Sequence, residues 1–206
     1  MPTDVKVEFI NRLSTTGLRV VEATSFVHPK WVPQLADGAA VMAGIDHHPG
    51  VRHPVLVPNE KGLEAALAAG ATEVAVFGAA SEAFSKANLN TDIEGSLAMF
   101  APVVAEATAA GLRVRGYVST VLGCPFQGDV PFDDVARVTT SLFELGVAEV
   151  SLGDTIGVGT PGRMQALLTH LAGSVDLSAI AVHCHDTYGQ GLANTLAAFE
   201  VGVTIA

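Results

Sequence analysis

Short apolar runs rich in β-branched residues alternate with helical segments along this chain, and most of the helical segments end at a glycine. We expect strands at residues 18–26, 54–57, 73–77, 113–121, 149–152 and 180–183, with a further short run at 203–205. Helices are expected near residues 3–13, 33–43, 61–69, 92–110, 132–145, 162–171 and 190–200. Strands that alternate with helices in this way indicate parallel βαβ units, so the predicted fold class is α/β.

Composition supports strands that are buried on both faces. Hydrophobic residues make up 49% of the chain and charged residues 16%. Parallel strands covered by helices on both sides read as continuous apolar runs like these. We find no Gly/Ser linker and no block of like charge, so we expect residues 1–206 to form a single domain.

Charge and cysteine content narrow the classes of function. Eleven basic and 21 acidic side chains give a formal net charge of −10, which disfavours nucleic acid and anionic membranes as partners. The chain shows neither an uncharged apolar run long enough to span a membrane nor a signal-peptide pattern at its start. Cys124 and Cys184 lie far apart, and we expect both to be reduced thiols.

Two architectures fit this alternation, a doubly wound open sheet and a (β/α)₈ TIM barrel. A barrel typically needs about 250 residues, and this chain has 206. A barrel also begins with a strand, whereas this chain opens on a helix and stops within a strand-like run. We therefore expect an incomplete barrel in which the first strand and most of the last strand are missing.

The segment His183-Cys184-His185-Asp186 follows a buried apolar strand. Side chains alternate along a strand, so His183 and His185 should point to one face and Cys184 to the other. Two imidazoles on one face at the carboxyl end of a strand can bind one divalent cation. The alternative is a pair of structural polar side chains at a strand end.

Two carboxylates stand near other strands. Glu22 lies within the apolar run 20–26 and must be paired, hydrogen-bonded or close to a metal; Ser25 follows nearer the strand end. Asp154 comes just past the strand that contains Ser151 and precedes a glycine-rich segment. Asp154 is either a catalytic carboxylate or a turn cap, and the glycine-rich segment lacks the spacing of a nucleotide-binding loop.

Three other residues carry weaker signals. Tyr117 lies inside an expected strand and Asn88 in a polar segment, and each taken alone is read as structural. Cys124 has no neighbouring His–Asp pair in the sequence, so we do not assign it as a nucleophile.

Taken together, these segments resemble the hydroxymethylglutaryl-CoA lyases, within a wider group of metal-dependent barrels that includes isopropylmalate and homocitrate synthases. The runs that carry the resemblance are KVEFINRLS, VEATSFVHPKWVPQLAD, VAVFGAASEAFSKANLN, VRGYVSTVLGCPFQG, VSLGDTIGVGTPG and AVHCHDTYGQGLAN. They span nearly the whole chain in order. The His-x-His-Asp element is shared by the wider group, whereas SFVHPKWVPQLAD, VFGAASE and SLGDTIGVGTPG are specific to the lyases and their close relatives.

The resemblance implies a (β/α)₈ barrel that binds Mg²⁺ or Mn²⁺ and cleaves 3-hydroxy-3-methylglutaryl-CoA to acetyl-CoA and acetoacetate. It implies that His183 and His185 bind the metal and that Glu22 and Asp154 are catalytic, with Asp154 helping to take the proton from the tertiary hydroxyl. It implies that Ser25, Asn88, Tyr117 and Ser151 line the substrate pocket.

The chain departs from the family at both ends. It has no match to the family's amino-terminal Arg-Asp pair, nor to the later catalytic Cys and Asn metal ligand. We therefore expect little activity from the chain alone. The resemblance also implies an acyl-CoA substrate, a homodimer for the full-length family and a cytoplasmic location in a bacterium, with the mitochondrial matrix as alternative. Two further interpretations are a related enzyme that condenses an acyl-CoA with a 2-oxo acid and a non-catalytic degenerate barrel.

Overall fold

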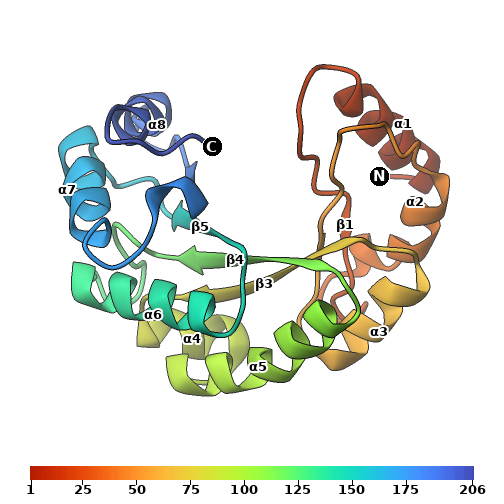
Figure 1. Ribbon diagram of the computed structural model, residues 1–206, viewed down its shortest axis with the longest axis horizontal. Helices are drawn as coiled ribbons and strands as arrows, with labels where there is room; N and C mark the ends of the chain where they lie inside the picture. Colours follow the sequence, from red (N-terminus) through yellow and green to blue (C-terminus); the bar gives the residue numbers. More distant parts are fainter. The chain divides into compact units, whose positions relative to one another are not determined.

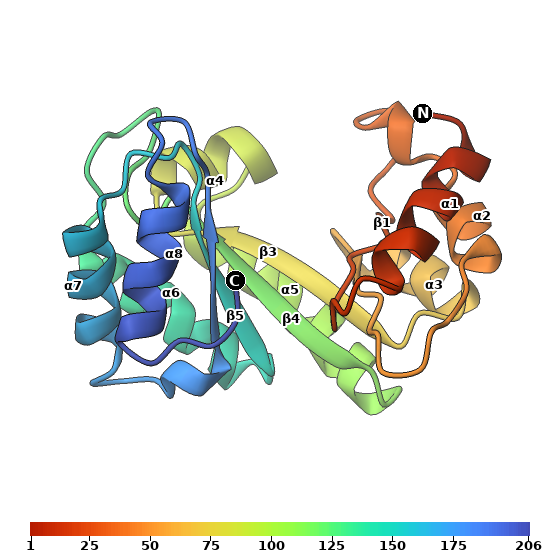
Figure 2. The same cartoon turned by 90° about the horizontal axis from the view of Figure 1, so that it is seen from above.

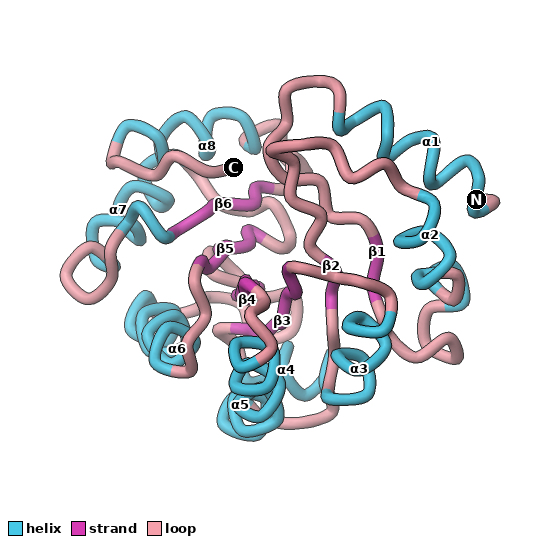
Figure 3. The backbone as a smooth tube through the Cα atoms, turned by 45° about the vertical axis from the view of Figure 1, so that its right-hand side comes forward, coloured by secondary structure: helices cyan, strands magenta, loops and turns pink.

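The computed structural model describes all 206 residues and contains one six-stranded sheet in the order β1-β2-β3-β4-β5-β6 (Figure 1). The strands are β1 (Thr24–Ser25), β2 (Val55–Leu56), β3 (Glu73–Ala79), β4 (Arg113–Ser119), β5 (Glu149–Asp154) and β6 (Ile180–Cys184). The helices are α1 (Thr3–Ser14), α2 (Gly38–Gly44), α3 (Glu60–Ala68), α4 (Glu82–Leu89), α5 (Ile93–Ala109), α6 (Phe132–Glu144), α7 (Pro161–Leu171) and α8 (Gly191–Glu200). Figure 3 shows helix and strand alternating along the chain. The parallel α/β class is confirmed.

The chain forms two compact units. The first unit comprises residues 1–76 and 102–115, and the second comprises residues 77–101 and 116–206. The expectation that residues 1–206 form a single domain stays a prediction. No helix is long and apolar enough to cross a membrane.

In the first unit, the predicted strand over residues 18–26 is wrong in extent. Backbone hydrogen bonds do join this segment to the chain around β2, as in Arg52 N–H to Arg19 O, Ala23 N–H to Pro54 O and Phe26 N–H to Leu56 O. Only Thr24 and Ser25 form a regular ladder with β2. Pro54 has no N–H to donate, so the parallel ladder is interrupted there.

Helix α1 packs against α2 in the first unit, as Figure 2 shows. Gly44 of α2 allows the approach, because a Cβ at that position would lie 2.9 Å from a methyl group of Val7. Ile10 and Ser14 are the buried residues of α1, whereas Val5 and Phe9 are exposed. Helix α1 therefore buries only a narrow face.

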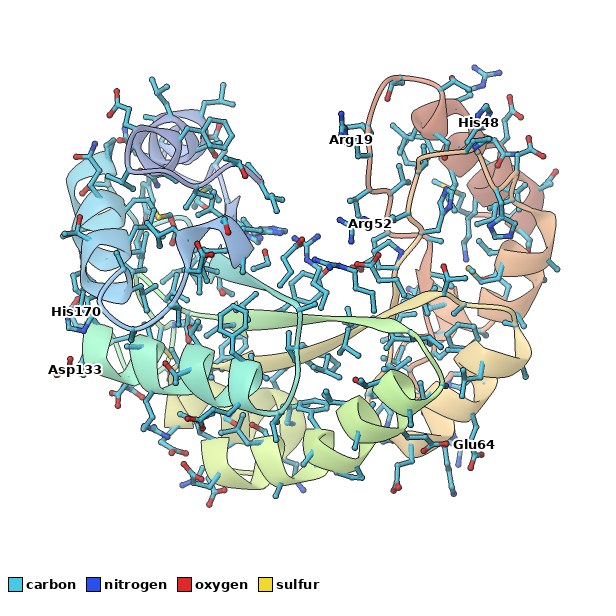
Figure 4. The ribbon with its side chains drawn as sticks, in the orientation of Figure 1. Arg19, His48, Arg52, Glu64, Asp133 and His170 are labelled. Atoms are coloured by element: carbon cyan, nitrogen blue, oxygen red, sulfur yellow. The ribbon has the colours of Figure 1, made fainter.

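A partly buried ion pair lies at the amino end of β3. The Glu73 carboxylate is buried and accepts hydrogen bonds from Arg52 Nη1 at 2.8 and 2.9 Å, with Arg113 Nε at 3.6 Å. Arg52 is labelled in Figure 4. Charges buried in a protein are stable only when they are paired in this way.

In the second unit, helices α6, α7 and α8 pack in succession beside β5 and β6. Helix α6 buries Val135, Val138, Thr139 and Leu142, which recur at helical spacing on one face. His170 Nε2 of α7 and Asp133 Oδ1 of α6 lie 2.9 Å apart at the surface (Figure 4). Strands β5 and β6 pair in register from Val150 with Ile180 to Asp154 with Cys184.

Several helix starts are explained by side-chain caps. Asn59 caps α3 by accepting from Gly62 N–H, and Thr160 caps α7 by accepting from Arg163 N–H. Helix α5 begins at Ile93, one residue later than predicted, and Asp92 Oδ1 accepts from Gly95 N–H at 2.8 Å. Helix α4 was not predicted; Ser81 begins it by accepting from Phe84 N–H.

Candidate active site

The two histidines of the His-x-His-Asp segment lie at the carboxyl end of β6. Both side chains are exposed, and their ring centroids are 5.1 Å apart with a tilt of 44° between the planes. Cys184 between them is half-buried, and burial raises the pKa of its thiol. The expectation that the two imidazoles share one face is confirmed.

The strand beside them presents Ser151 and Gly153 on the same face as His183. In the parallel ladder Gly153 pairs with His183 and Ser151 with Ala181, and paired residues face the same side of a sheet. Ser151 is buried. A Cβ at Gly153 would lie 3.5 Å from Val118 O and 3.6 Å from Thr155 Oγ1, so this glycine packs in ordinary contact with the end of β4.

Tyr117 of β4 also lies on this face. Along β4 the alternate residues Val114, Gly116 and Val118 are buried, and Gly116 packs against Leu142 of α6. Tyr117 is half-buried on the side away from α6. The second unit therefore places Tyr117, Ser151, His183 and His185 on one face of the sheet.

Asp154 differs from this group. It is the last residue of β5, not a residue beyond it, and it pairs in register with Cys184, so its side chain leaves the sheet on the face opposite to His183. The carboxylate is fully buried, with Oδ1 3.2 Å from Val158 N and Oδ2 2.9 Å from Gly159 N. Asp154 therefore holds the glycine-rich loop 156–160 against the end of β5.

Glycine is required twice in that loop. Gly157 has φ +67°, a conformation that side chains rarely adopt, and a Cβ there would lie 2.9 Å from His185 O. A Cβ at Gly159 would lie 2.4 Å from Leu122 Cδ1 and 2.7 Å from Asp154 Oδ2. Asn194 of α8 donates to Gly159 O at 3.0 Å. The loop is thus closely packed between the end of β5 and α8.

Asn88 is exposed on α4, the helix that the sequence did not predict. Ser81 at the start of this helix donates to Cys124 Sγ at 3.0 Å. Burial raises the pKa of the Cys124 thiol, but the bonds from Ser81 and from nearby backbone N–H groups outweigh it and hold the pKa below its ordinary value. Cys124 therefore anchors the loop after β4 to α4, which agrees with its structural assignment.

Glu22 and Ser25 belong to the first unit. Glu22 is exposed and precedes β1, so its predicted position within a strand is wrong. Ser25 ends β1; its buried hydroxyl accepts from Val27 N–H at 3.3 Å and lies 3.4 Å from Leu56 O. Ser25 also lines a cavity of about 360 Å³ in this unit.

Two side chains are candidate ligands for the cation that the resemblance implies. His183 and His185 are exposed neighbours on one face and can supply two nitrogen ligands. No group of three or more His, Cys, Asp or Glu side chains gathers anywhere in the chain in a way that could hold a metal ion. His183 and His185 can therefore supply two of the ligands that a cation needs.

Sequence reasoning missed three residues around the site. Thr155 Oγ1 accepts from Thr120 N–H at 2.7 Å, and Thr120 is a fully buried residue with φ +65°. Asn194 is also fully buried. Hydrogen bonds from these side chains to the backbone of distant loops leave no local sequence pattern. Of the residues that hold these loops, the sequence indicated only Asp154, which precedes a glycine-rich segment.

Residues 1–205 match the family model described as HMGL-like. The chain belongs to the HMGL-like family. It is 58% identical over 205 residues to the mitochondrial hydroxymethylglutaryl-CoA lyase of Bos taurus, covering 100% of this chain and 63% of that protein. It is 56% identical to the cytoplasmic 3-hydroxy-3-methylglutaryl-CoA lyase of Rattus norvegicus, covering 100% of this chain and 60% of that protein. The chain thus spans less than two thirds of the length of these relatives.

Solved structures agree with the sequence relatives. The HMG-CoA lyase of Brucella melitensis superposes with a TM-score of 0.98 at 52% identity, covering all of this chain and 72% of that one. An HMG-CoA lyase from Acinetobacter baumannii, in complex with coenzyme A and 3-methylmalate, superposes with a TM-score of 0.93 at 36% identity, covering 98% of this chain and 66% of that one. The expected fold class, a TIM barrel present here in part, is confirmed: six parallel strands in sequence order match these enzymes throughout.

Proposed function

We propose that this chain forms part of a lyase that cleaves 3-hydroxy-3-methylglutaryl-CoA to acetyl-CoA and acetoacetate. One observation carries the proposal: the paired imidazoles of His183 and His185 lie at the carboxyl end of β6, in a chain that resembles hydroxymethylglutaryl-CoA lyases over its whole length. Active sites of barrel enzymes are built at the carboxyl ends of the strands.

In this proposal His183 and His185 hold a divalent cation, Mg²⁺ or Mn²⁺. When bound, the cation polarises substrate oxygens as a Lewis acid. Both imidazoles are exposed, so further ligands could reach a cation that they hold. The two nitrogens alone suit a hard cation poorly, since Mg²⁺ prefers oxygen ligands.

The neighbouring side chains bind and orient the substrate. Tyr117 and Ser151 lie on the same face of the sheet as His183. Their hydroxyl groups can donate hydrogen bonds to oxygen atoms of the substrate. Ser25 and Asn88 are proposed to bind other parts of the same molecule, and Glu22 is proposed to act with the catalytic groups. An acyl-CoA substrate is consistent with the coenzyme A complex of the Acinetobacter baumannii relative.

Asp154 is proposed to help accept the proton from the tertiary hydroxyl. Both of its oxygens already accept N–H bonds from the loop 156–160. Each oxygen keeps a further lone pair that could accept a proton, but the carboxylate is fully buried, so the substrate hydroxyl must first gain access to it. The proposal therefore requires movement of the glycine-rich loop when substrate binds.

The test is an acetoacetate assay with 3-hydroxy-3-methylglutaryl-CoA and Mg²⁺ or Mn²⁺. It compares this chain with a chimera in which the chain replaces its matched region in the Brucella melitensis lyase. We expect cleavage by the chimera, and loss of cleavage in its His183→Ala and His185→Ala variants. A folded chimera that releases no acetoacetate contradicts the proposal. Consumption of acetyl-CoA with a 2-oxo acid instead supports the condensing enzyme.

Location and assembly complete the proposal. Relatives include mitochondrial and cytoplasmic enzymes, and we propose a bacterial cytoplasmic enzyme that is active as a homodimer. Size-exclusion chromatography with light scattering on the chimera checks the assembly.

A further inference from the structure

Three histidines lie close together in the segment that joins α2 to β2, outside the candidate active site. His53 is buried, with 4% of its surface exposed, whereas His47 and His48 are exposed, and His48 is labelled in Figure 4. The ring centroids of His47 and His53 are 5.8 Å apart, and the two planes are nearly perpendicular at 83°. Histidine is the side chain that ordinarily changes its charge between about pH 5 and 8. A change of pH in that range therefore acts directly on this cluster.

His53 docks this segment on the end of α1. Ser14 Oγ lies 3.0 Å from His53 Nε2 and donates its own proton to the backbone of α1 at 2.9 Å. The serine oxygen therefore accepts from His53, so the neutral ring carries its proton on Nε2. Asn11 of the same helix accepts from Asp46 N–H at 2.8 Å. Two side chains of α1 thus hold residues 46–53, which we call the histidine latch.

The surroundings of His53 disfavour a second proton on its ring. Burial is the largest cause that lowers the pKa of His53 from 6.5, and the charges of His47 and His48 lower it further. The carboxyl end of α1 favours a cation, but the pKa is lowered in spite of it. Asp46 is the only carboxylate of the latch, so one negative charge stands against three histidines once all of them are protonated.

The charged side chains of the neighbouring elements do not change this balance. Arg12 of α1 pairs with Glu8 of the same helix at 2.6 Å. Arg52 of the latch pairs with Glu73 of β3 at 2.8 Å. Arg19, in the segment before β1, is exposed and adds a positive charge. Helix α2 has no titratable side chain, so no other carboxylate of these elements is left to neutralise the cluster.

We infer that the histidine latch is a pH-sensitive device, which stays closed on α1 while His53 is neutral and opens when the three histidines take up protons. The opening is local, because α1 keeps a second attachment. Lys6 Nζ lies 2.6 Å from Asp37 Oδ1 beside α2, and the hydrogen bond from Lys6 is the largest cause that lowers the pKa of Asp37 from 3.8. That pair therefore stays charged in mild acid.

Opening also acts on the segment before β1. Arg52 N–H donates to Arg19 O, and Val21 N–H donates to Arg52 O, each at 2.9 Å. These bonds join the latch to the residues that lead into Glu22, so release of the latch loosens this segment as well. The latch is a property of the first unit, and it holds whatever reaction the complete protein catalyses.

The experiment is hydrogen–deuterium exchange of the 206-residue chain at pH 7.5 and 5.5, read by mass spectrometry. Protection factors compare the observed with the intrinsic exchange rate at each pH, so the direct effect of pH on exchange cancels. Residues 46–53 report on the latch, and residues 60–79, in α3 and β3, are the reference within the same unit. Circular dichroism checks that the chain and each variant are folded at both pH values.

We expect the protection of the latch to fall about tenfold from pH 7.5 to 5.5, since a histidine with a pKa of 6.5 in the open latch and a lower one in the closed latch shifts opening by that factor. The reference should change less than twofold. His53→Gln cannot gain a proton and should show a change within twofold. His170→Gln, a histidine of the second unit, is the matched control and should behave as the wild-type chain does.

A second variant keeps the test decisive should His53→Gln open the latch at both pH values. The double variant His47→Gln with His48→Gln alters only exposed positions and keeps His53. It removes two neighbouring charges, so the pKa of His53 in the closed latch rises and the loss of protection should shrink to about threefold. Three results would overturn the inference: unchanged protection of the wild-type latch, an equal loss in the reference residues, or a double variant that loses as much protection as the wild-type chain.

Discussion

Replacing Asp154 by Asn tests whether this carboxylate holds the glycine-rich loop. Asp154 is fully buried, and its two oxygens accept N–H bonds from Val158 at 3.2 Å and Gly159 at 2.9 Å. An amide keeps one acceptor and places an NH₂ group against the other N–H. The variant loses one charge-assisted bond and leaves a buried donor without an acceptor, each worth about 1–3 kcal/mol.

We therefore expect Asp154→Asn to lower the free energy of unfolding by about 2–4 kcal/mol, the sum of those two effects with partial relaxation of the loop. Urea denaturation followed by circular dichroism measures the change. The control is Asp129→Asn, the same chemical change at a carboxylate that is 91% exposed, where less than about 1 kcal/mol is expected. Equal urea midpoints for the two variants would refute the reasoning.

The same variant separates the two roles of Asp154 in the chimera. If the carboxylate only holds the loop, activity per folded molecule should recover at low temperature, where the variant is folded. If Asp154 also accepts the substrate proton, kcat should remain low with the protein fully folded. The temperature dependence of kcat decides between these outcomes.

Three further predictions concern stability. Glu73→Gln should cost about 1–3 kcal/mol in urea denaturation, because the buried side chain loses the charge that accepts hydrogen bonds from the partly exposed Arg52 guanidinium; a free energy of unfolding within about 0.5 kcal/mol of wild type would contradict this. Gly159→Ala should cost about 1–3 kcal/mol through overpacking, since its Cβ would lie 2.4 Å from Leu122 Cδ1, and a melting temperature within 1 °C of wild type would count against that packing. Burial first, and then nearby histidines, lower the pKa of His53 from 6.5, so the unfolded chain takes up this proton at higher pH than the folded chain does. The contribution of His53 to the free energy of unfolding is therefore full above pH 6.5 and declines as the pH falls from there toward the pKa of the folded state. The urea midpoint of the wild-type chain should drop more between pH 7.5 and 5.5 than that of His53→Gln. Equal drops for the two proteins would disprove this role of His53.

The order of strands and helices was predictable because it depends on local chemistry. β-Branched runs favour strands, and caps such as Asn59 fix helix starts through contacts a few residues away. The common face of His183 and His185 follows from the alternation of side chains along any strand. These features need no knowledge of distant residues.

Other features were decided by contacts between segments far apart in the sequence. The regular part of β1 is two residues long because Pro54, which directly precedes β2, has no N–H group to donate to the segment before Thr24. Asp154 was readable as a polar residue before a glycine-rich loop, but its burial and its bonds to Val158 and Gly159 depend on how that loop folds back against α8.

The cavity beside Ser25 shows the same division. Glycine and alanine at the starts of α2 and α3 are unremarkable in the sequence, since small residues suit many helices. They form a cavity only because the two helix starts approach the end of β1 closely. The sequence by itself thus determined the alternating elements, the family and the paired histidines. Tertiary packing decided the length of β1, the burial of Asp154 and the cavity, because each depends on atoms that only the fold brings together.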